Sequence, residues 1–220
     1  MWVELLSGKI FGSGILAILF ISMLTFSPYF QSTAMLKLTS GTETSNAIIL
    51  KLSFPPPDVA RNGSWDSVTM STLPLYGAPG EPVLPFRELQ VLLPEGKQAE
   101  GIGVTTGDES VLHGRISVAY GRTPLPTSSN VTVNDQPNEA IYNSTAPFPS
   151  SLYSDVFEQD LRGYSILIFR VYPVQYIPKT GELSYFEAMT VTVTLKETGE
   201  ISPYFRGLPE DEALLSGIVD

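Results

Sequence analysis

Hydrophobic and polar residues alternate in several short segments of the chain, and a period of two is typical of a β-strand with one buried face. The clearest segment is residues 189–195 (MTVTVTL), where every second residue is apolar and the residues between them are threonine. This pattern predicts an antiparallel strand with an apolar inner face and a polar outer face. Residues 48–54 repeat the alternation and end at three prolines, residues 55–57, which cannot continue a strand.

Three further segments have the composition of strands but a less regular pattern. Residues 89–93 form a short apolar run that ends at Pro94-Glu95-Gly96, and residues 111–120 are a weaker candidate. Residues 166–176 (ILIFRVYPVQY) are rich in β-branched and aromatic residues, which favours a buried strand. Pro173 lies inside this segment and predicts an edge position or a bulge there. Six aromatic residues in and near this segment are predicted to fill the core: Tyr164, Phe169, Tyr172, Tyr176, Tyr185 and Phe186.

The connections between these segments are rich in proline and glycine. Residues 178–181 (PKTG) predict a turn that joins the segments 166–176 and 189–195 into a hairpin. Residues 123–151 are rich in Pro, Ser, Thr and Asn and predict a long loop, whereas residues 209–215 predict one short helix with an acidic start. We therefore predict an all-β fold, either an antiparallel β-sandwich or a partly open barrel, preceded by an N-terminal hydrophobic helix.

The N-terminal segment, residues 1–34, predicts the compartment of the protein. Residues 10–26 are almost wholly apolar, follow Lys9, and precede the small residues Ser32-Thr33-Ala34. This order is that of a secretory signal peptide. An uncleaved membrane anchor at residues 10–26 is the alternative, because that stretch would span about 25 Å as a helix. We expect an exported protein, secreted or at the cell surface, with membrane contact only through this segment.

Charge and composition exclude several classes of function. The chain has 13 basic and 23 acidic residues, a net charge of −10, no cysteine, and a single histidine, His113. The acidic balance argues against nucleic acid as a partner. The missing cysteines exclude disulfides, thiolate metal sites and a thiol nucleophile, and a lone histidine is not a multi-histidine metal site. We predict no catalytic residue, no metal site and no cofactor, although the acidic surface leaves calcium binding open.

Carboxylate pairs could in principle act as the acid and base of a glycosidase. No spacing selects a pair among the candidates Glu81, Asp108, Glu109, Asp155, Glu158 and Asp160.

Three Asn-x-Ser/Thr sequons lie in segments that are predicted to be loops. Their asparagines are Asn62, Asn130 and Asn143. They are candidate glycosylation sites in a host that glycosylates exported proteins.

Two Gly/Pro-punctuated motifs carry a resemblance to a known family. Residues 80–85 (GEPVLP) followed by 89–96 (LQVLLPEG), and residues 162–183 (RGYSILIFRVYPVQYIPKTGEL), resemble the gingipain propeptide family. The strand 189–195 follows at the family's usual spacing, and the resemblance covers about residues 45–205.

The resemblance implies a function as well as a fold. In that family the domain precedes a caspase-like cysteine peptidase, assists its folding, keeps it latent, and is removed by cleavage after basic residues. We therefore expect residues 35–205 to form a non-catalytic propeptide domain and residues 206–220 to be a linker towards a peptidase domain that these 220 residues do not contain. The partner would be a gingipain-like cysteine peptidase, in the same longer protein or as a separate chain.

Two arginines are candidates for the functional residues of such a domain. A propeptide blocks a peptidase of basic specificity by placing an Arg or Lys side chain in its acidic pocket. Arg122, in a loop next to Pro124, is the candidate inhibitory residue, and Arg206, after the last predicted strand, is the candidate processing site. Each has a plain alternative, a solvated loop arginine for Arg122 and a linker arginine without a role for Arg206.

A second function from another class stays open. A stand-alone exported β-sandwich that mediates adhesion or surface binding would have the same composition and the same strand pattern.

Overall fold

The computed structural model describes residues 41–44, 46–126, 128, 133, 135–217 and 219, which belong to one compact unit spanning Ala34–Asp220. The predicted N-terminal helix lies outside the described residues. Within the described part of the chain, no helix is long and apolar enough to cross a membrane.

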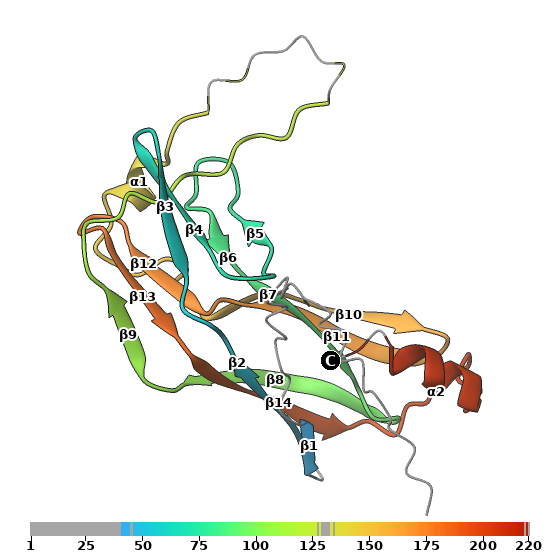
Figure 1. Ribbon diagram of the computed structural model, residues 1–220. Helices are drawn as coiled ribbons and strands as arrows, with labels where there is room; N and C mark the ends of the chain where they lie inside the picture. Colours follow the sequence, from blue (N-terminus) through green and yellow to red (C-terminus); the bar gives the residue numbers. More distant parts are fainter. Residues whose placement is uncertain are drawn as a thin grey trace, which may run out of the picture. The chain divides into compact units, whose positions relative to one another are not determined.

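The described residues form antiparallel sheets (Figure 1), and most connections between consecutive strands are short. A four-stranded sheet has the order β1 (Gly41–Thr44), β2 (Ala47–Ser53), β14 (Ala188–Glu197), β8 (Lys97–Thr106). A three-stranded sheet has the order β10 (Tyr153–Leu161), β11 (Tyr164–Val171), β7 (Arg87–Leu92), and a second has the order β12 (Val174–Ile177), β13 (Glu182–Phe186), β9 (Glu109–Leu112). Two hairpins, β3 (Asp58–Asn62) with β4 (Trp65–Thr69) and β5 (Leu75–Tyr76) with β6 (Leu84–Pro85), complete the strands. Two short helices are α1 (Glu139–Tyr142) and α2 (Pro209–Leu215).

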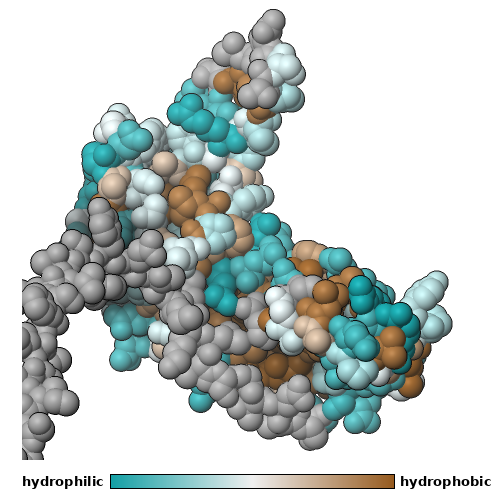
Figure 2. All heavy atoms as spheres, turned by 45° about the vertical axis from the view of Figure 1, so that its right-hand side comes forward, coloured by the Kyte–Doolittle hydropathy of each residue, from teal (hydrophilic) through white to brown (hydrophobic). Residues whose placement is uncertain are grey.

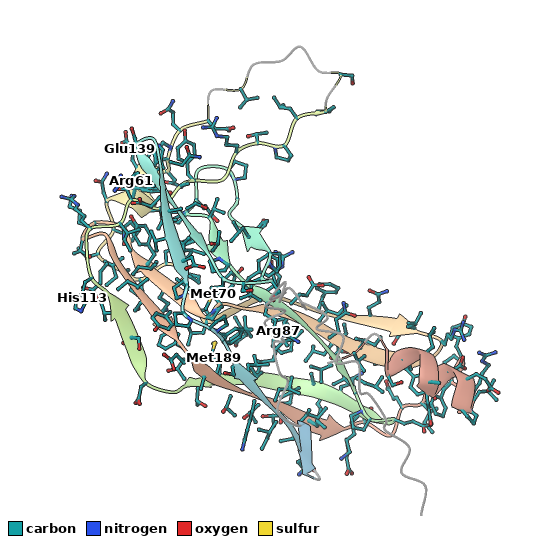
Figure 3. The ribbon with its side chains drawn as sticks, in the orientation of Figure 1. Arg61, Met70, Arg87, His113, Glu139 and Met189 are labelled. Atoms are coloured by element: carbon teal, nitrogen blue, oxygen red, sulfur yellow. The ribbon has the colours of Figure 1, made fainter. Side chains whose placement is uncertain are left out.

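One hydrophobic core lies between the four-stranded sheet and the sheet β10-β11-β7. The alternate apolar residues of β14 and β2 face it in register, with Val191 opposite Leu50 and Val193 opposite Ile48. Met189, at the start of the same face, points between the layers (Figure 3). Phe169 of β11 meets them from the other layer and is fully buried. The all-β prediction is confirmed, and the described strands form facing sheets without closing into a barrel.

The segment 166–176 differs from its prediction as a single strand. The chain leaves β11 at Val171 and enters β12 at Val174, and the two strands belong to different sheets. Pro173 lies at this change of sheet, where its missing N–H costs no ladder hydrogen bond, and its carbonyl accepts a hydrogen bond from the N–H of Phe186 at 2.9 Å.

The turn at residues 178–181 is confirmed, but the predicted partner strand was wrong. The turn joins β12 to β13, whereas β14 pairs with β2 and β8 in another sheet. Strand β13 is only five residues long. After one further residue the chain enters β14, which belongs to the four-stranded sheet.

Candidate functional site

Arg122 lies at the start of a long loop that leaves the sheets. The described residues on both ends of this loop, 122–126 and 135–138, contain no strand or helix. They project away from the body of the domain (Figures 1 and 2). Arg122 is exposed, and its guanidinium carbon lies 5.7 Å from the centre of the Tyr120 ring. The structure therefore places the candidate inhibitory arginine where a partner can reach it.

The backbone fixes the start of this loop against the segment 77–81. The N–H of Gly80 donates to the carbonyl of Gly121 at 2.9 Å, and the N–H of Gly121 donates to the carbonyl of Glu81 at 2.8 Å. A Cβ atom added to Gly121 would lie 2.0 Å from the carbonyl oxygen of Gly77. Only glycine allows such a close approach of two backbones, and Arg122 follows directly after it.

The end of the loop is attached to the same segment. The N–H of Asn138 donates to the carbonyl of Gly80 at 2.9 Å, so one glycine contacts both ends of the loop. Gly80 belongs to the motif GEPVLP at residues 80–85. The backbone at the start of this motif thus fixes both ends of the loop, a role that the sequence pattern alone did not indicate.

Asp135 closes the base of the loop with its side chain. Its carboxylate accepts hydrogen bonds from the N–H of Thr123 at 2.9 Å and from the Thr123 hydroxyl at 2.7 Å. Its backbone carbonyl accepts a hydrogen bond from the Tyr120 hydroxyl at 3.1 Å. The side-chain and backbone hydrogen bonds from Thr123 lower the pKa of Asp135, and the nearby positive charge of Arg122 contributes in the same direction.

Aromatic side chains hold the segment that leads into the loop. The ring of Trp65 meets Tyr120 and Tyr142 edge to face, with ring centres 5.3 and 5.7 Å apart. The Tyr142 hydroxyl donates to the carbonyl of Val118 at 2.9 Å, and burial raises the pKa of Tyr142. Two backbone hydrogen bonds then join Asp66, next to Trp65, to residues 117 and 119. Packed aromatic rings and hydrogen bonds therefore hold the segment that precedes Arg122.

Removing the Asp135 carboxylate by Asp135→Ala should loosen the loop base. We expect the Thr123 amide to exchange with solvent at least about tenfold faster, because a hydrogen bond to a charged acceptor is lost. Since the folded pKa of Asp135 is lowered, the closed base is stable above the ordinary pKa of an aspartate and opens as the pH falls through the lowered value. Amide exchange measured by NMR checks this. Asp108→Ala, at an exposed aspartate, is the control, and equal exchange of Thr123 in both variants would contradict the prediction.

Arg206, the candidate processing residue, binds a buried carboxylate of α2. Its Nη2 donates to both side-chain oxygens of Asp211 at 2.7 Å, and its Nε donates to one of them at 3.1 Å. Nη1 of Arg162 donates to the same carboxylate at 2.6 Å. Asp211 is 0 % exposed. The hydrogen bond from Arg162 and those from Arg206 lower its pKa, although burial acts in the opposite direction.

The two candidate arginines belong to separate sites. Arg122 contacts Tyr120 and neighbours the loop base, whereas the contacts of Arg206 are with Asp211 beside Arg162. Sequence reasoning missed Arg162 and Asp135 because each acts through a residue distant along the chain. It missed Asp211 because the sequence does not distinguish this residue from the other acidic residues at the start of α2. The acidic residues at the start of α2 suit a helix N-terminus, and that pattern does not identify Asp211 as the partner of two arginines.

The remaining candidates lie on the surface or outside the described residues. Asn62, at the end of β3, and Asn143, after α1, are exposed, whereas Asn130 is outside the described residues. His113 follows β9 and points outward (Figure 3). The side chain of Asp155 pairs with Arg170 at 3.0 Å.

Comparisons with known proteins agree with this architecture. A family model described as Propeptide_C25 matches residues 57–207. A structure described as giving insight into the zymogenic latency of gingipain K from Porphyromonas gingivalis is 18% identical, with a TM-score of 0.62, over 76% of this chain and 96% of that one. A complex of the RgpB pro- and mature domains from the same organism is 18% identical, with a TM-score of 0.61, over 84% of this chain and 96% of that one. No curated protein matches.

Proposed function

Because the chain belongs to the Propeptide_C25 family, we propose that it keeps a gingipain-type cysteine peptidase latent and is itself non-catalytic. The similar solved structures concern the latency of gingipain K and a complex of RgpB pro- and mature domains. At 18% identity these structures support the fold alone.

The observation that carries the proposal is the exposed Arg122 on a loop whose base is fixed. The guanidinium group can form paired hydrogen bonds with carboxylates in the specificity pocket of a peptidase that prefers basic residues. The hydrogen bonds of Gly80, Gly121 and Asp135 order the loop base before any partner binds. Less conformational entropy is then lost on association, so binding is tighter.

We also propose that the protein is exported and acts outside the cell. The apolar segment at residues 10–26 supports export through a signal peptide or an anchor, and the latent complex would then form in the exported state. We further propose that the domain assists the folding of its peptidase partner, whether both belong to one longer protein or to two chains. Release would follow cleavage after Arg206, which lies beyond β14.

A titration tests this function directly. The full chain is mixed in increasing amounts with the gingipain-type peptidase of the same organism, while residual activity and fragments of the chain are measured. We expect slow, tight inhibition followed by cleavage after a basic residue.

The variant Arg206→Ala separates binding from processing in the same assay. It should inhibit as well as the unaltered chain but should not be cut at position 206. No inhibition at micromolar concentrations by a folded, intact chain would contradict the proposal and would favour a surface-binding module.

A further inference from the structure

We propose that Arg206 is guarded by a clasp, formed by Arg162, Arg206, Asp211 and Leu215, which keeps the Arg206–Gly207 bond from being cleaved until α2 leaves the sheet. The biological use of this clasp rests on the proposed processing at Arg206. Its existence is independent of any peptidase partner.

The first element of the clasp is the shared carboxylate. Asp211 has no exposed surface and accepts hydrogen bonds from two guanidinium groups, whereas the side chains of Arg162 and Arg206 are 46% and 53% exposed. A buried charge that loses a partner is costly. Arg206 therefore cannot enter another protein's pocket without leaving Asp211 to Arg162 alone.

The second element is the face of α2 that contacts the sheet. Asp211 and Leu215, four residues apart, are the buried residues of this helix, so they share one face. Leu215 packs against Ile166 and Ile168 on the outer side of β11. The ion pair and the apolar contact thus hold the same helix face, and opening either one strains the other. Hydrophilic and hydrophobic side chains mix on the surface at this end of the domain (Figure 2).

The third element is the turn between β10 and β11, which presents Arg162. Leu161 pairs with Tyr164, so Arg162 and Gly163 form a two-residue turn, and their φ angles are 56° and 87°. Two positive φ angles are typical of a type I′ turn, where asparagine is the favoured first residue. A positive φ angle is disfavoured for arginine. The ion pair of Arg162 with Asp211 gives a reason for an arginine at this position.

The chain just before Arg206 is docked on the same turn. A Cβ atom on Gly163 would lie 2.2 Å from the backbone nitrogen of Phe205. The ring of Phe205 meets that of Tyr164 edge to face, with centres 4.9 Å apart. Residues on the N-terminal side of the candidate bond are therefore held in backbone contact with the hairpin.

This conformation is not one that a peptidase can cut. A peptidase binds its substrate extended and places the side chain before the cleaved bond in a specificity pocket. Here Gly207 has a φ of 58°, helix α2 begins two residues later at Pro209, and the Arg206 side chain is engaged by Asp211. Cleavage therefore requires the clasp to open first.

Hydrolysis would also make the opening permanent. Water adds across the Arg206–Gly207 bond, which gives a carboxylate on Arg206 and an ammonium group on Gly207. Residues 207–220, including α2, are then no longer tethered, so the clasp does not close again.

Limited digestion with trypsin tests the clasp on the full chain. Fragments are quantified over time by mass spectrometry, and cleavage after Arg122 in the exposed loop serves as the internal reference. We expect slow cleavage after Arg206 in the unaltered chain. The variant Arg162→Asn suits the turn better but removes the guanidinium group, so it should speed cleavage after Arg206 at least tenfold without changing cleavage after Arg122. Leu215→Ala, which removes the apolar contact of the helix but keeps all three residues of the ion pair, should do the same.

Asp155→Asn is the matched control. It removes an exposed ion pair with Arg170 on the same sheet, at a residue whose φ of 54° asparagine tolerates. It should leave cleavage after Arg206 unchanged. The clasp is refuted if Arg206 is cut in the unaltered chain as fast as in a free peptide of residues 200–213, or if neither clasp variant alters the rate.

The two proposals fail in different ways. If the chain does not inhibit a gingipain-type peptidase but the trypsin result holds, the clasp stands and the proposed function falls. If Arg162→Asn and Leu215→Ala inhibit normally and neither is cut faster than the unaltered chain, the function stands and the clasp falls.

Discussion

Replacing Arg122 by alanine is expected to weaken inhibition of a gingipain-type peptidase at least about 100-fold, without changing the thermal stability of the domain. An arginine anchor that fills a charged pocket is among the residues that contribute most to an interface. The side chain is exposed and lies near the Tyr120 ring, so the folded domain loses little when it is removed. The measurement is the inhibition constant of each chain, with the melting temperature determined in parallel.

Two further variants make this result specific. Arg122→Lys keeps the charge but loses the planar fork, so we expect an intermediate loss of about tenfold. Lys179→Ala removes an exposed positive charge from the turn between β12 and β13 and should leave inhibition unchanged. Equal inhibition by Arg122→Ala and the unaltered chain would show that the loop does not carry the blocking residue.

Phe169→Ala is expected to lower the free energy of unfolding by about 3–5 kcal/mol, the usual cost of deleting a buried aromatic side chain. Phe169 is 0 % exposed and lies opposite Leu89 in the neighbouring strand β7. The cavity would open in the middle of the core, where both layers are already packed. Unfolding by urea, followed by fluorescence or circular dichroism, gives the free energy.

Phe157→Ala is the matched control on the neighbouring strand β10. Phe157 is 51% exposed, so its removal should change the free energy of unfolding by less than about 1 kcal/mol. Similar losses for the two variants would mean that the core between the sheets is not where this structure places it.

The strands that could be predicted from the sequence are those with one buried face. β14 and β2 line the core with alternate side chains, and their pattern therefore shows in the sequence. β8 and β10 lie at sheet edges, and most of their residues are at least partly exposed. Glycines interrupt β8 and a bulge interrupts β10. These strands form because the neighbouring strands provide backbone hydrogen-bond partners. The residues of the strand itself do not reveal such a partner.

The candidate site could be predicted only in part for the same reason. Arg122 is a candidate because a basic residue in a stiff loop is visible in the sequence, and the structure shows that its side chain is exposed. The support from Gly80 and Asp135 depends on residues that meet only after folding. Asp211 gave no signal as a partner of Arg206, since any of the acidic residues at the start of α2 could have faced solvent.

The way in which the long loop is attached has a consequence for how such a domain can change. Its two ends are fixed by the backbone of Gly80 and Gly121 and by Asp135, and none of these contacts uses the side chains of residues 124–126, the described part of the loop directly after Thr123. Insertions and substitutions in surface loops cost a fold little when the framework is independent of them. Residues 124–126, the described residues that directly follow Thr123, can therefore change at little cost to the fold, while Arg122 keeps its place beside the loop base.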